Sequence, residues 1–318
     1  MAAQDMKTIR LNLETVAAYP RVATVGFFDG VHAGHRYLVQ QVIAEARATG
    51  MTATVITFAR HPRQVLRQDY VPQLLDTLSS KLDHLADTQV DECVLLDFNT
   101  EMASLSAYDF MRQILRDRLQ VQTLVIGYDN RFAHNRSEGF DDYVRYGNEL
   151  GIKVIRNDAL ILDGIKVSSS VVRGFIAQGE IALANRCLGY PYTIEGTVVT
   201  GYSEGHKMGY PTANLDIASL TQMLPQQGVY ATLWSMEGDP LWHEAMTNVG
   251  TRPTFPGRGV SVETHIFDFD GDVYGAHMQL KFCARIRAER RFEDAAALRA
   301  QLREDEYEAR TFFKQYKG

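Results

Sequence analysis

The chain has 318 residues, more than a single hydrophobic core usually organises, so its length predicts two domains. Hydrophobic residues make up 45% of the sequence and charged residues 23%, a balance that excludes an intrinsically disordered chain. The net charge of −6 excludes a general attraction to nucleic acids or anionic membranes, although a local basic site stays open.

The cysteine pattern and the N-terminus indicate the compartment. Cys93, Cys187 and Cys283 are odd in number and too far apart for a disulfide framework or a metal-ligand motif, which suits a reducing environment. The first 16 residues lack a basic-then-apolar signal, and no apolar run approaches membrane-spanning length. We expect a cytoplasmic protein with no membrane partner.

In the first part of the chain, short apolar segments alternate with helical ones. The predicted strands are residues 22–27, 52–58, 93–98, 124–127 and 153–155. The predicted helices are residues 37–48, 106–118 and 140–150, and Ser106 and Asp109 are spaced as a capping box. This alternation predicts an α/β domain with a parallel sheet and helices on both faces.

The pattern changes after residues 189–191, where we place the domain boundary. Five strands separated by Gly, Pro and Asp turns follow, and they predict a small antiparallel barrel or sandwich: residues 192–200, 229–236, 244–248, 262–267 and 278–286. A final helix is predicted over residues 292–316, with these side chains close to one face: Phe292, Ala295, Leu298, Leu302, Ala309 and Phe313.

The first candidate site joins the first predicted strand to the first helix. Its sequence runs Gly26, Phe27, Phe28, Asp29, Gly30, Val31, His32, Ala33, Gly34 and His35. Ligands of open parallel sheets bind at the carboxyl ends of the strands, and the glycines allow close approach of a ligand to the backbone. The helix start offers free N–H groups to a phosphate, and both histidines can donate hydrogen bonds to its oxygens.

An alternative to this phosphate site is a surface turn with solvated histidines. That would be the better interpretation of a single histidine in a loop. A His-x-Gly-His motif directly after a glycine-bearing strand end favours ligand binding instead. The motif is neither a dinucleotide fingerprint nor a P-loop, because no Gly-Lys-Ser/Thr follows it.

A second segment, residues 166–173, holds Lys166, three serines that open a helix (including Ser169 and Ser170), and Arg173. Such serines can supply hydroxyl and N–H groups to phosphates, although alone they are more often a plain helix cap. Together with the His-x-Gly-His motif, they predict the second half of an ATP-binding site.

This pair of motifs resembles the nucleotidyltransferase superfamily, which transfers adenylyl or cytidylyl groups. Three further segments narrow the resemblance to the bifunctional bacterial riboflavin kinases/FMN adenylyltransferases, also called FAD synthetases: residues 57–66, 127–132 and 174–192. The resemblance spans about residues 20–310. It implies a Rossmann-like first domain in which His61, Pro62 and Asp129 line the flavin and nucleotide side of the site.

The second candidate site is the segment 201–214. Gly205 and Lys207 lie in a loop that can fold over phosphates, while Thr212 and Asn214 offer hard neutral oxygens to Mg²⁺. The glycines alone would indicate a surface hairpin. The complete Pro-Thr-Ala-Asn sequence of residues 211–214 resembles the riboflavin kinase signature.

A candidate base lies on the strand predicted at 262–267, where Glu263, His265 and Phe267 share one face. A carboxylate there can accept the proton of a primary alcohol that attacks a γ-phosphate, and in the family the matching Glu has that role. A merely exposed strand Glu is otherwise the commoner case. The segment 282–292 also fits the family, with Arg285 expected to contact the flavin.

The resemblance implies two reactions. The domain at residues 189–318 phosphorylates riboflavin to FMN with Mg²⁺ and ATP, and the domain at residues 1–188 adenylylates FMN to FAD and releases pyrophosphate. The second reaction needs no covalent nucleophile, because the FMN phosphate itself attacks. Positioning and charge stabilisation carry it, and these residues are expected to supply them: His32, His35, Ser169, Ser170 and Arg173.

Three positions depart from the family pattern: Val171 replaces a basic residue, Asn130 an aromatic one and His206 an arginine. Two other interpretations stay open. A cytidylyltransferase accounts for the histidines but not for the segment 211–214 or for Glu263, and a flavin-sensing regulator leaves two sets of reactive residues unused. The acidic balance and the lack of a basic–aromatic stripe speak against nucleic acid, and the sequence leaves the oligomeric state open.

Overall fold

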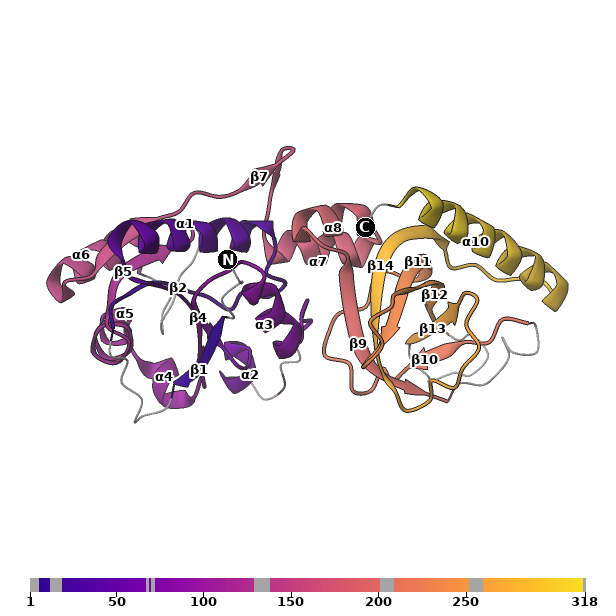
Figure 1. The fold of residues 1–318 in the computed structure, drawn as a ribbon, viewed down its shortest axis with the longest axis horizontal. Helices are drawn as coiled ribbons and strands as arrows, with labels where there is room; N and C mark the ends of the chain where they lie inside the picture. Colours follow the sequence, from indigo (N-terminus) through magenta and orange to yellow (C-terminus); the bar gives the residue numbers. More distant parts are fainter. Residues whose placement is uncertain are drawn as a thin grey trace. The chain divides into compact units, whose positions relative to one another are not determined.

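A computed structural model describes residues 6–11, 19–66, 69, 72–128, 138–200, 209–251 and 260–316. The chain divides into two compact units, Met1–Ser169 and Ser170–Gly318, whose elements are labelled in Figure 1. Among the described residues, no helix combines the length and apolar composition needed to cross a membrane.

The first unit is built on a six-stranded sheet in the order β1-β4-β3-β2-β5-β6, and every neighbouring pair is parallel, as predicted. Its strands are β1 (Lys7–Leu11), β2 (Arg21–Val25), β3 (Thr52–Phe58), β4 (Glu92–Leu96), β5 (Val121–Ile126) and β6 (Lys153–Arg156). The sequence did not predict β1. Within the described part of the chain this edge strand pairs only with β4, and it is largely exposed, so it lacks the apolar run that marks the buried strands.

Helices cover both faces of this sheet, as predicted, and the alternation of side chains along β4 shows it. Val94 and Leu96 lie in one apolar cluster with the helical segments after residue 106, whereas Cys93 and Leu95 lie in another with α1 and α3. The helices are α1 (Ala33–Thr49), α2 (Pro62–Leu66), α3 (Leu78–Ala86), α4 (Thr100–Ser104), α5 (Ala107–Asp109) and α6 (Phe140–Leu150). A small hairpin follows, formed by β7 (Ile161–Leu162) and β8 (Ile165–Lys166).

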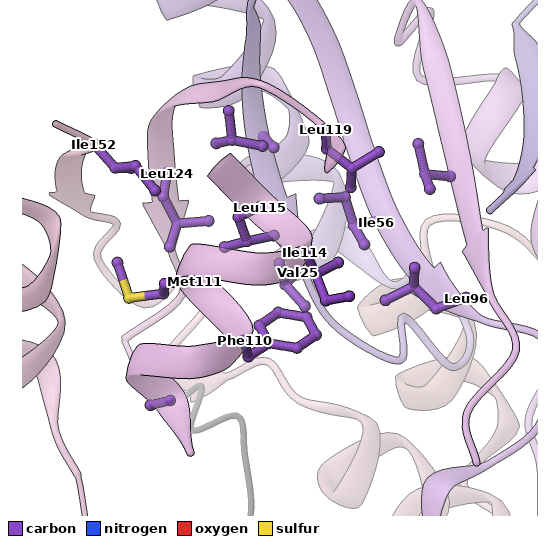
Figure 2. Close-up of a cluster of buried hydrophobic side chains, with 14 of the residues drawn as sticks. Val25, Ile56, Leu96, Phe110, Met111, Ile114, Leu115, Leu119, Leu124 and Ile152 are labelled. Carbon is purple, nitrogen blue, oxygen red and sulfur yellow. The ribbon is translucent and has the colours of Figure 1, made fainter. Parts of the chain in front are cut away.

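The helix predicted at 106–118 has an unexpected geometry. Ser106 caps it as predicted, because its hydroxyl accepts a hydrogen bond from the Asp109 amide at 3.0 Å. From Phe110 onward, however, the chain forms a π-helix, η1 (Phe110–Arg118), instead of the α-helix that we predicted. Its wider turn lets two adjacent pairs of apolar residues face the sheet, and the residues in contact across this interface are shown in Figure 2: Phe110, Met111, Ile114, Leu115, Val25, Ile56, Leu96 and Leu124.

The second unit contains a closed antiparallel barrel, the first of the two predicted architectures. The barrel order is β10-β13-β12-β11-β14-β9, and β9 also pairs with β10. Its strands are β9 (Tyr192–Val199), β10 (Ala213–Leu215), β11 (Gly228–Met236), β12 (His243–Thr251), β13 (Val260–Ile266) and β14 (His277–Ala288). Helices α7 (Ser169–Gln178) and α8 (Ile181–Leu188) precede the barrel, and α10 (Ala295–Gln315) follows it.

The buried face of α10 differs from the predicted one. Ala309 and Phe313 are buried as expected, but the row continues through two polar residues, Gln301 and Asp305. The predicted Ala295 is exposed. Asp305 is buried because it forms an ion pair. Both of its carboxylate oxygens accept hydrogen bonds from the Arg287 guanidinium of β14, at 2.8 and 2.7 Å.

This buried pair should stabilise the docking of α10. The Asp305 side chain is 1% exposed, so Asp305→Ala leaves a largely desolvated arginine and should lower the free energy of unfolding by about 3 kcal/mol. The matched control is Asp268→Ala, which removes an ion pair to Arg310 on the same helix. Because Asp268 is 79% exposed, that change should cost less than about 1 kcal/mol. Denaturant unfolding of both variants measures the difference, and equal effects would contradict the assignment.

Candidate active sites

The loop between β2 and α1 has a strained backbone. Phe28, Gly30 and Val31 all have positive φ angles, of 55°, 79° and 25°. Only glycine adopts such angles at no cost, and a β-branched residue there is an outlier. Gly26 is also constrained, since an added Cβ would lie 3.0 Å from the Phe28 ring. Strain of this kind concentrates at ligand-binding and catalytic sites.

The two histidines of this loop form one stacked unit at the start of α1. The Nδ1 atom of His32 accepts a hydrogen bond from the His35 amide at 3.2 Å and thereby caps the helix. The ring centroids of the two side chains lie 3.6 Å apart at an interplanar angle of 16°. Phe28 packs edge-on against His35, with centroids 5.0 Å apart. The histidines therefore lie where helical N–H groups and the helix dipole favour an anion.

The structure brings the serine segment to this loop. The Ser169 hydroxyl donates a hydrogen bond to the Asp29 carbonyl at 3.0 Å, across 140 residues of sequence. A Cβ on Gly34 would lie 3.2 Å from the His32 ring and 3.3 Å from the Val167 carbonyl, so glycine permits this approach. The two halves predicted for the ATP site are thus in direct contact through Ser169. Ser170 and Arg173 belong to the second unit, and their role in this site stays a prediction.

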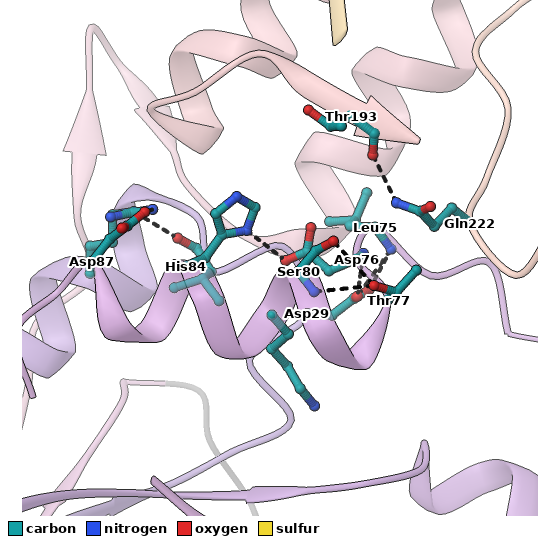
Figure 3. Close-up of polar contacts among 12 residues, drawn as sticks. Asp29, Leu75, Asp76, Thr77, Ser80, His84, Asp87, Thr193 and Gln222 are labelled. Atoms are coloured by element: carbon teal, nitrogen blue, oxygen red, sulfur yellow. Dashed lines mark hydrogen bonds and ion pairs between the residues drawn. The ribbon is translucent and has the colours of Figure 1, made fainter. Parts of the chain in front are cut away.

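The Asp29 side chain binds backbone amides of another segment. Its carboxylate accepts hydrogen bonds from the amides of Leu75 and Asp76, at 3.0 to 3.3 Å, and the residue is only 4% exposed (Figure 3). Asp76 in turn contacts His84 at 3.2 Å. Asp29 therefore holds the strained loop against the segment that leads into α3, and its predicted contact with ATP remains a prediction.

The remaining residues predicted for the first site lie in different places. Lys166 is exposed, with its ammonium 3.8 Å from the centroid of the Tyr128 ring. The His61 ring packs against Phe27 with centroids 4.6 Å apart, and Pro62 is the first residue of α2. Asp129 and the variant position Asn130 lie outside the described residues.

Lys81 of α3 was missed by the sequence reasoning. It is 3% exposed, and its ammonium donates hydrogen bonds to the carbonyls of Phe58 and Phe27, at 2.9 and 3.3 Å. Burial lowers the pKa of this lysine to about 8, against the opposing influence of Cys93, Asp29 and Asp76. A lysine in the middle of an amphipathic helix gives no sequence signal of burial, because such residues usually face solvent.

The second site lies on the strands β10, β13 and β12. Glu263 of β13 is paired across the sheet with Asn214 of β10 and with Asn248 of β12. The Ser261 hydroxyl donates a hydrogen bond to a carboxylate oxygen of Glu263 at 3.2 Å. Glu263 is half-buried, while its neighbours Val262 and Thr264 point into the barrel. The predicted base therefore lies on the outer face of the barrel, beside two amide side chains.

Asn214 is 8% exposed, and its amide nitrogen donates to the Thr212 carbonyl at 3.3 Å. This contact uses the nitrogen end of the amide, so the carbonyl oxygen can serve as a metal ligand. Among the described residues, no group of three His, Cys, Asp or Glu side chains could hold a metal ion. Two neutral oxygens fit Mg²⁺, which takes most of its ligands from water and phosphate. Gly205, His206 and Lys207 lie outside the described part of the chain.

Two further residues bear on the second candidate site: Arg285 of β14, and Glu289, which directly follows that strand. The Arg285 guanidinium donates to the Gln227 carbonyl at 2.8 Å, and a Cβ on Gly179 or Gly228 would meet it within 3.0 Å. Its predicted flavin contact stays a prediction. Glu289 was not singled out from the sequence. A Cβ on Gly250 would meet both its carboxylate and the Asn248 amide within 3.0 Å, so a second carboxylate lies close to the Glu263 strand pair.

Comparisons with known proteins assign each half of the chain to a protein family. The FAD synthetase family model matches residues 15–171, and the riboflavin kinase model matches residues 188–313. A curated protein of Escherichia coli (strain K12), named bifunctional riboflavin kinase/FMN adenylyltransferase, is 36% identical over 97% of this chain and 98% of its own. A Pseudomonas fluorescens protein of the same name is 34% identical over 91% of this chain and 92% of its own.

A solved structure covers nearly the same extent. The crystal structure described as a macrolide-efflux protein from Streptococcus pneumoniae has a TM-score of 0.83 and 30% sequence identity, and the match covers 96% of this chain and 99% of that one. The two family models match in the expected order, and the relatives match along more than 90% of the chain. The chain belongs to the family of bifunctional riboflavin kinases/FMN adenylyltransferases.

Proposed function

We propose that the chain makes FAD from riboflavin in two steps, and that a separate set of residues carries each step. The C-terminal half is a riboflavin kinase and the N-terminal half is an FMN adenylyltransferase. Their small-molecule partners are riboflavin, FMN and ATP. The riboflavin kinase model matches residues 188–313, a range that includes residues 211–214 and Glu263, which a cytidylyltransferase leaves unexplained.

In the first step, Glu263 acts as general base. It accepts the proton of the ribityl 5′-hydroxyl as that oxygen bonds to the γ-phosphorus of ATP, and the bond to the β,γ-bridging oxygen breaks to release ADP. The hydrogen bond from Ser261 at 3.2 Å holds the carboxylate in place. Thr212 and Asn214 would hold Mg²⁺, which neutralises charge on the phosphates when bound.

In the second step, an oxygen of the FMN phosphate attacks the α-phosphorus of the second ATP, and pyrophosphate leaves. His32 and His35 donate hydrogen bonds to the phosphates at the start of α1, where the negative charge develops. Ser169 lies beside this loop, and it supplies donors to the phosphates together with Ser170 and Arg173. The contact between Ser169 and Asp29 carries this assignment, because it joins two motifs that are far apart in the sequence.

One assay tests both steps. The protein is incubated with riboflavin, ATP and Mg²⁺, and the flavins are separated by chromatography. FMN should appear first and FAD after it, and FMN supplied in place of riboflavin should give FAD directly. FMN without FAD would contradict the role of the N-terminal site, and no product from riboflavin would contradict that of the barrel.

The boundary between the two activities follows from contacts of α7 and α8 with the barrel. The Asn185 side chain of α8 donates to the Phe282 carbonyl and accepts from the Tyr192 amide, both at 2.8 Å. The Ile176 carbonyl of α7 accepts from the Gln226 amide at 3.1 Å. We propose that both helices fold with the kinase barrel, earlier in the chain than the boundary predicted at 189–191.

Two fragments test this boundary. A fragment of residues 170–318 should fold and convert riboflavin to FMN. A fragment of residues 190–318 lacks both helices, and it should unfold at a lower denaturant concentration because it loses the contacts of Asn185 and Ile176. Equal stability of the two fragments would return the boundary to residues 189–191, and an inactive longer fragment would mean that the barrel depends on the first unit.

A further inference from the structure

Lys81 makes three polar contacts although almost none of its surface meets water. It is 3% exposed, and lysine is among the residues least often fully buried. Its three N–H groups have three acceptors: the Phe58 carbonyl at 2.9 Å, the Phe27 carbonyl at 3.3 Å and the Thr57 hydroxyl at 3.4 Å. The ammonium also lies 4.4 Å from the centroid of the Phe27 ring.

These acceptors lie where two different loops begin. Phe27 follows β2 and leads into the loop of the two histidines. Phe58 is the last residue of β3 and leads into the segment of His61. The strands β2 and β3 are parallel neighbours, with Val25 paired to Ile56, so both loops leave the same edge of the sheet. We name residues 26–32, proposed to bind ATP, the nucleotide-binding loop, and residues 59–62, in which His61 and Pro62 are proposed to contact the flavin, the flavin-binding loop. Lys81 therefore bonds at once to residues at the start of both loops.

Other contacts hold the nucleotide-binding loop in place and join it to the flavin-binding loop. Asp29 fixes the nucleotide-binding loop to the amides of Leu75 and Asp76, and His32 caps α1. Between the two loops, the Thr57 hydroxyl donates to the Phe27 carbonyl at 3.1 Å, and the Phe27 ring packs on His61. Lys81 adds a charged link to these neutral ones, and hydrogen bonds from a charged donor are about twice as strong.

The titratable groups around Lys81 come from the nucleotide-binding loop, from the segment before α3 and from β4. Asp29 of the nucleotide-binding loop and Asp76 before α3 favour its protonated form, and Asp76 is itself paired with His84 (Figure 3). Cys93 of β4 lies on the remaining side, and burial raises the pKa of its thiol to about 12, so it is neutral near pH 8. The link is therefore an ammonium at neutral pH and an amine with one donor fewer at higher pH.

We propose that Lys81 is a positioning residue of the adenylyl-transfer site, whose ammonium group sets the spacing between the nucleotide-binding loop and the flavin-binding loop. The inference rests on the proposed function of these two loops. In-line attack of the FMN phosphate on ATP depends on this spacing, whereas binding of either substrate alone depends on its own loop. Loss of the link misplaces two bound reactants relative to each other.

Steady-state kinetics of Lys81→Met tests the proposal, since Met keeps an unbranched chain of similar length. In the full chain with FMN and ATP, kcat for FAD formation should fall by about 10- to 100-fold, while both KM values stay within about threefold. Phosphorylation of riboflavin by the same protein should be unchanged, and a circular dichroism spectrum equal to that of the wild-type protein reports that the first unit is folded. The matched control is Lys153→Met, which removes an exposed lysine of β6 in the same unit and should leave both activities unchanged.

The pH profile supplies a second readout that a purely structural role would not move. In the wild-type protein, kcat for FAD formation should decline as the pH rises through about 8, because Lys81 loses one donor there, while the kinase step shows no matching decline. Lys81→Met should lack this decline. The wild-type profile decides the question even if the variant fails to fold.

Two results would overturn the inference: a wild-type profile that is flat between pH 7 and 9.5, or a folded Lys81→Met protein with normal kcat. A variant whose KM for ATP rises while kcat is kept would also overturn it, because that pattern assigns Lys81 to one loop alone. Failure of the proposed function is distinguishable, since the wild-type protein would then form no FAD from FMN at any pH.

Discussion

Replacing Glu263 with Gln should slow phosphorylation of riboflavin roughly 100- to 10,000-fold. The change keeps the shape of the side chain and its contact with the Ser261 hydroxyl, but it removes the base that accepts the proton of the 5′-hydroxyl. The same protein should still convert supplied FMN to FAD, because Glu263 takes no part in that step and the histidines that do belong to the other unit. Separate assays with riboflavin and with FMN measure the two rates.

The matched control for this change is Glu244→Gln, which alters an exposed glutamate on the neighbouring strand β12. It should leave both steps unchanged. If Glu263→Gln lowers both activities while circular dichroism shows an intact fold, the two reactions share a site and the division of roles is wrong.

Replacing His35 with Ala should lower FAD formation on the order of 100- to 1,000-fold, the usual cost of one donor to a developing negative charge. His35 stacks on His32 at the start of α1, so its loss also removes support for the second histidine. Riboflavin should still be phosphorylated, and FMN should accumulate. Chromatography of the flavins over time measures this accumulation.

The matched control is His277→Ala, which removes an exposed histidine of β14. This variant should make FAD at the wild-type rate. FAD formation by His35→Ala within about threefold of the wild-type rate would rule out a role for this donor in the transfer step, because one lost donor costs far more. A parallel loss of kinase activity would again indicate one shared site.

The sequence predicted those parts of the fold that depend on local patterns. Buried strands of the parallel sheet carry continuous apolar runs, and the barrel strands follow at regular spacing between turn residues, so both could be recognised. The edge strand β1 and the three-residue strand β10 lack such patterns. The π-helix η1 depends on how side chains after Phe110 fit the sheet, and no short-range signal announces it.

Long-range polar contacts limited how much of the two candidate sites could be predicted from the sequence. The histidines and serines of the first site were predicted because their spacing relates to helix starts. The bonds from the Asp29 carboxylate to two distant backbone amides had no such local signal. Lys81 and Asp305 are charged residues on helices whose burial depends on acceptors or donors from distant strands. Propensity and periodicity describe near neighbours in the chain, so they carry no information about such partners.

The hydrogen bond from Ser169 to Asp29 has a consequence for synthesis of the chain on the ribosome. Domains fold from the N-terminus as they emerge, so the first unit has every residue of this contact once residue 169 is free. The barrel closes only later, because β9 must wait for its partner β14, with Tyr192 paired to Phe282. Each new molecule therefore has both partners of this contact in the adenylyl-transfer site before the kinase barrel that supplies the FMN has closed, and this order is the reverse of the order of the reactions.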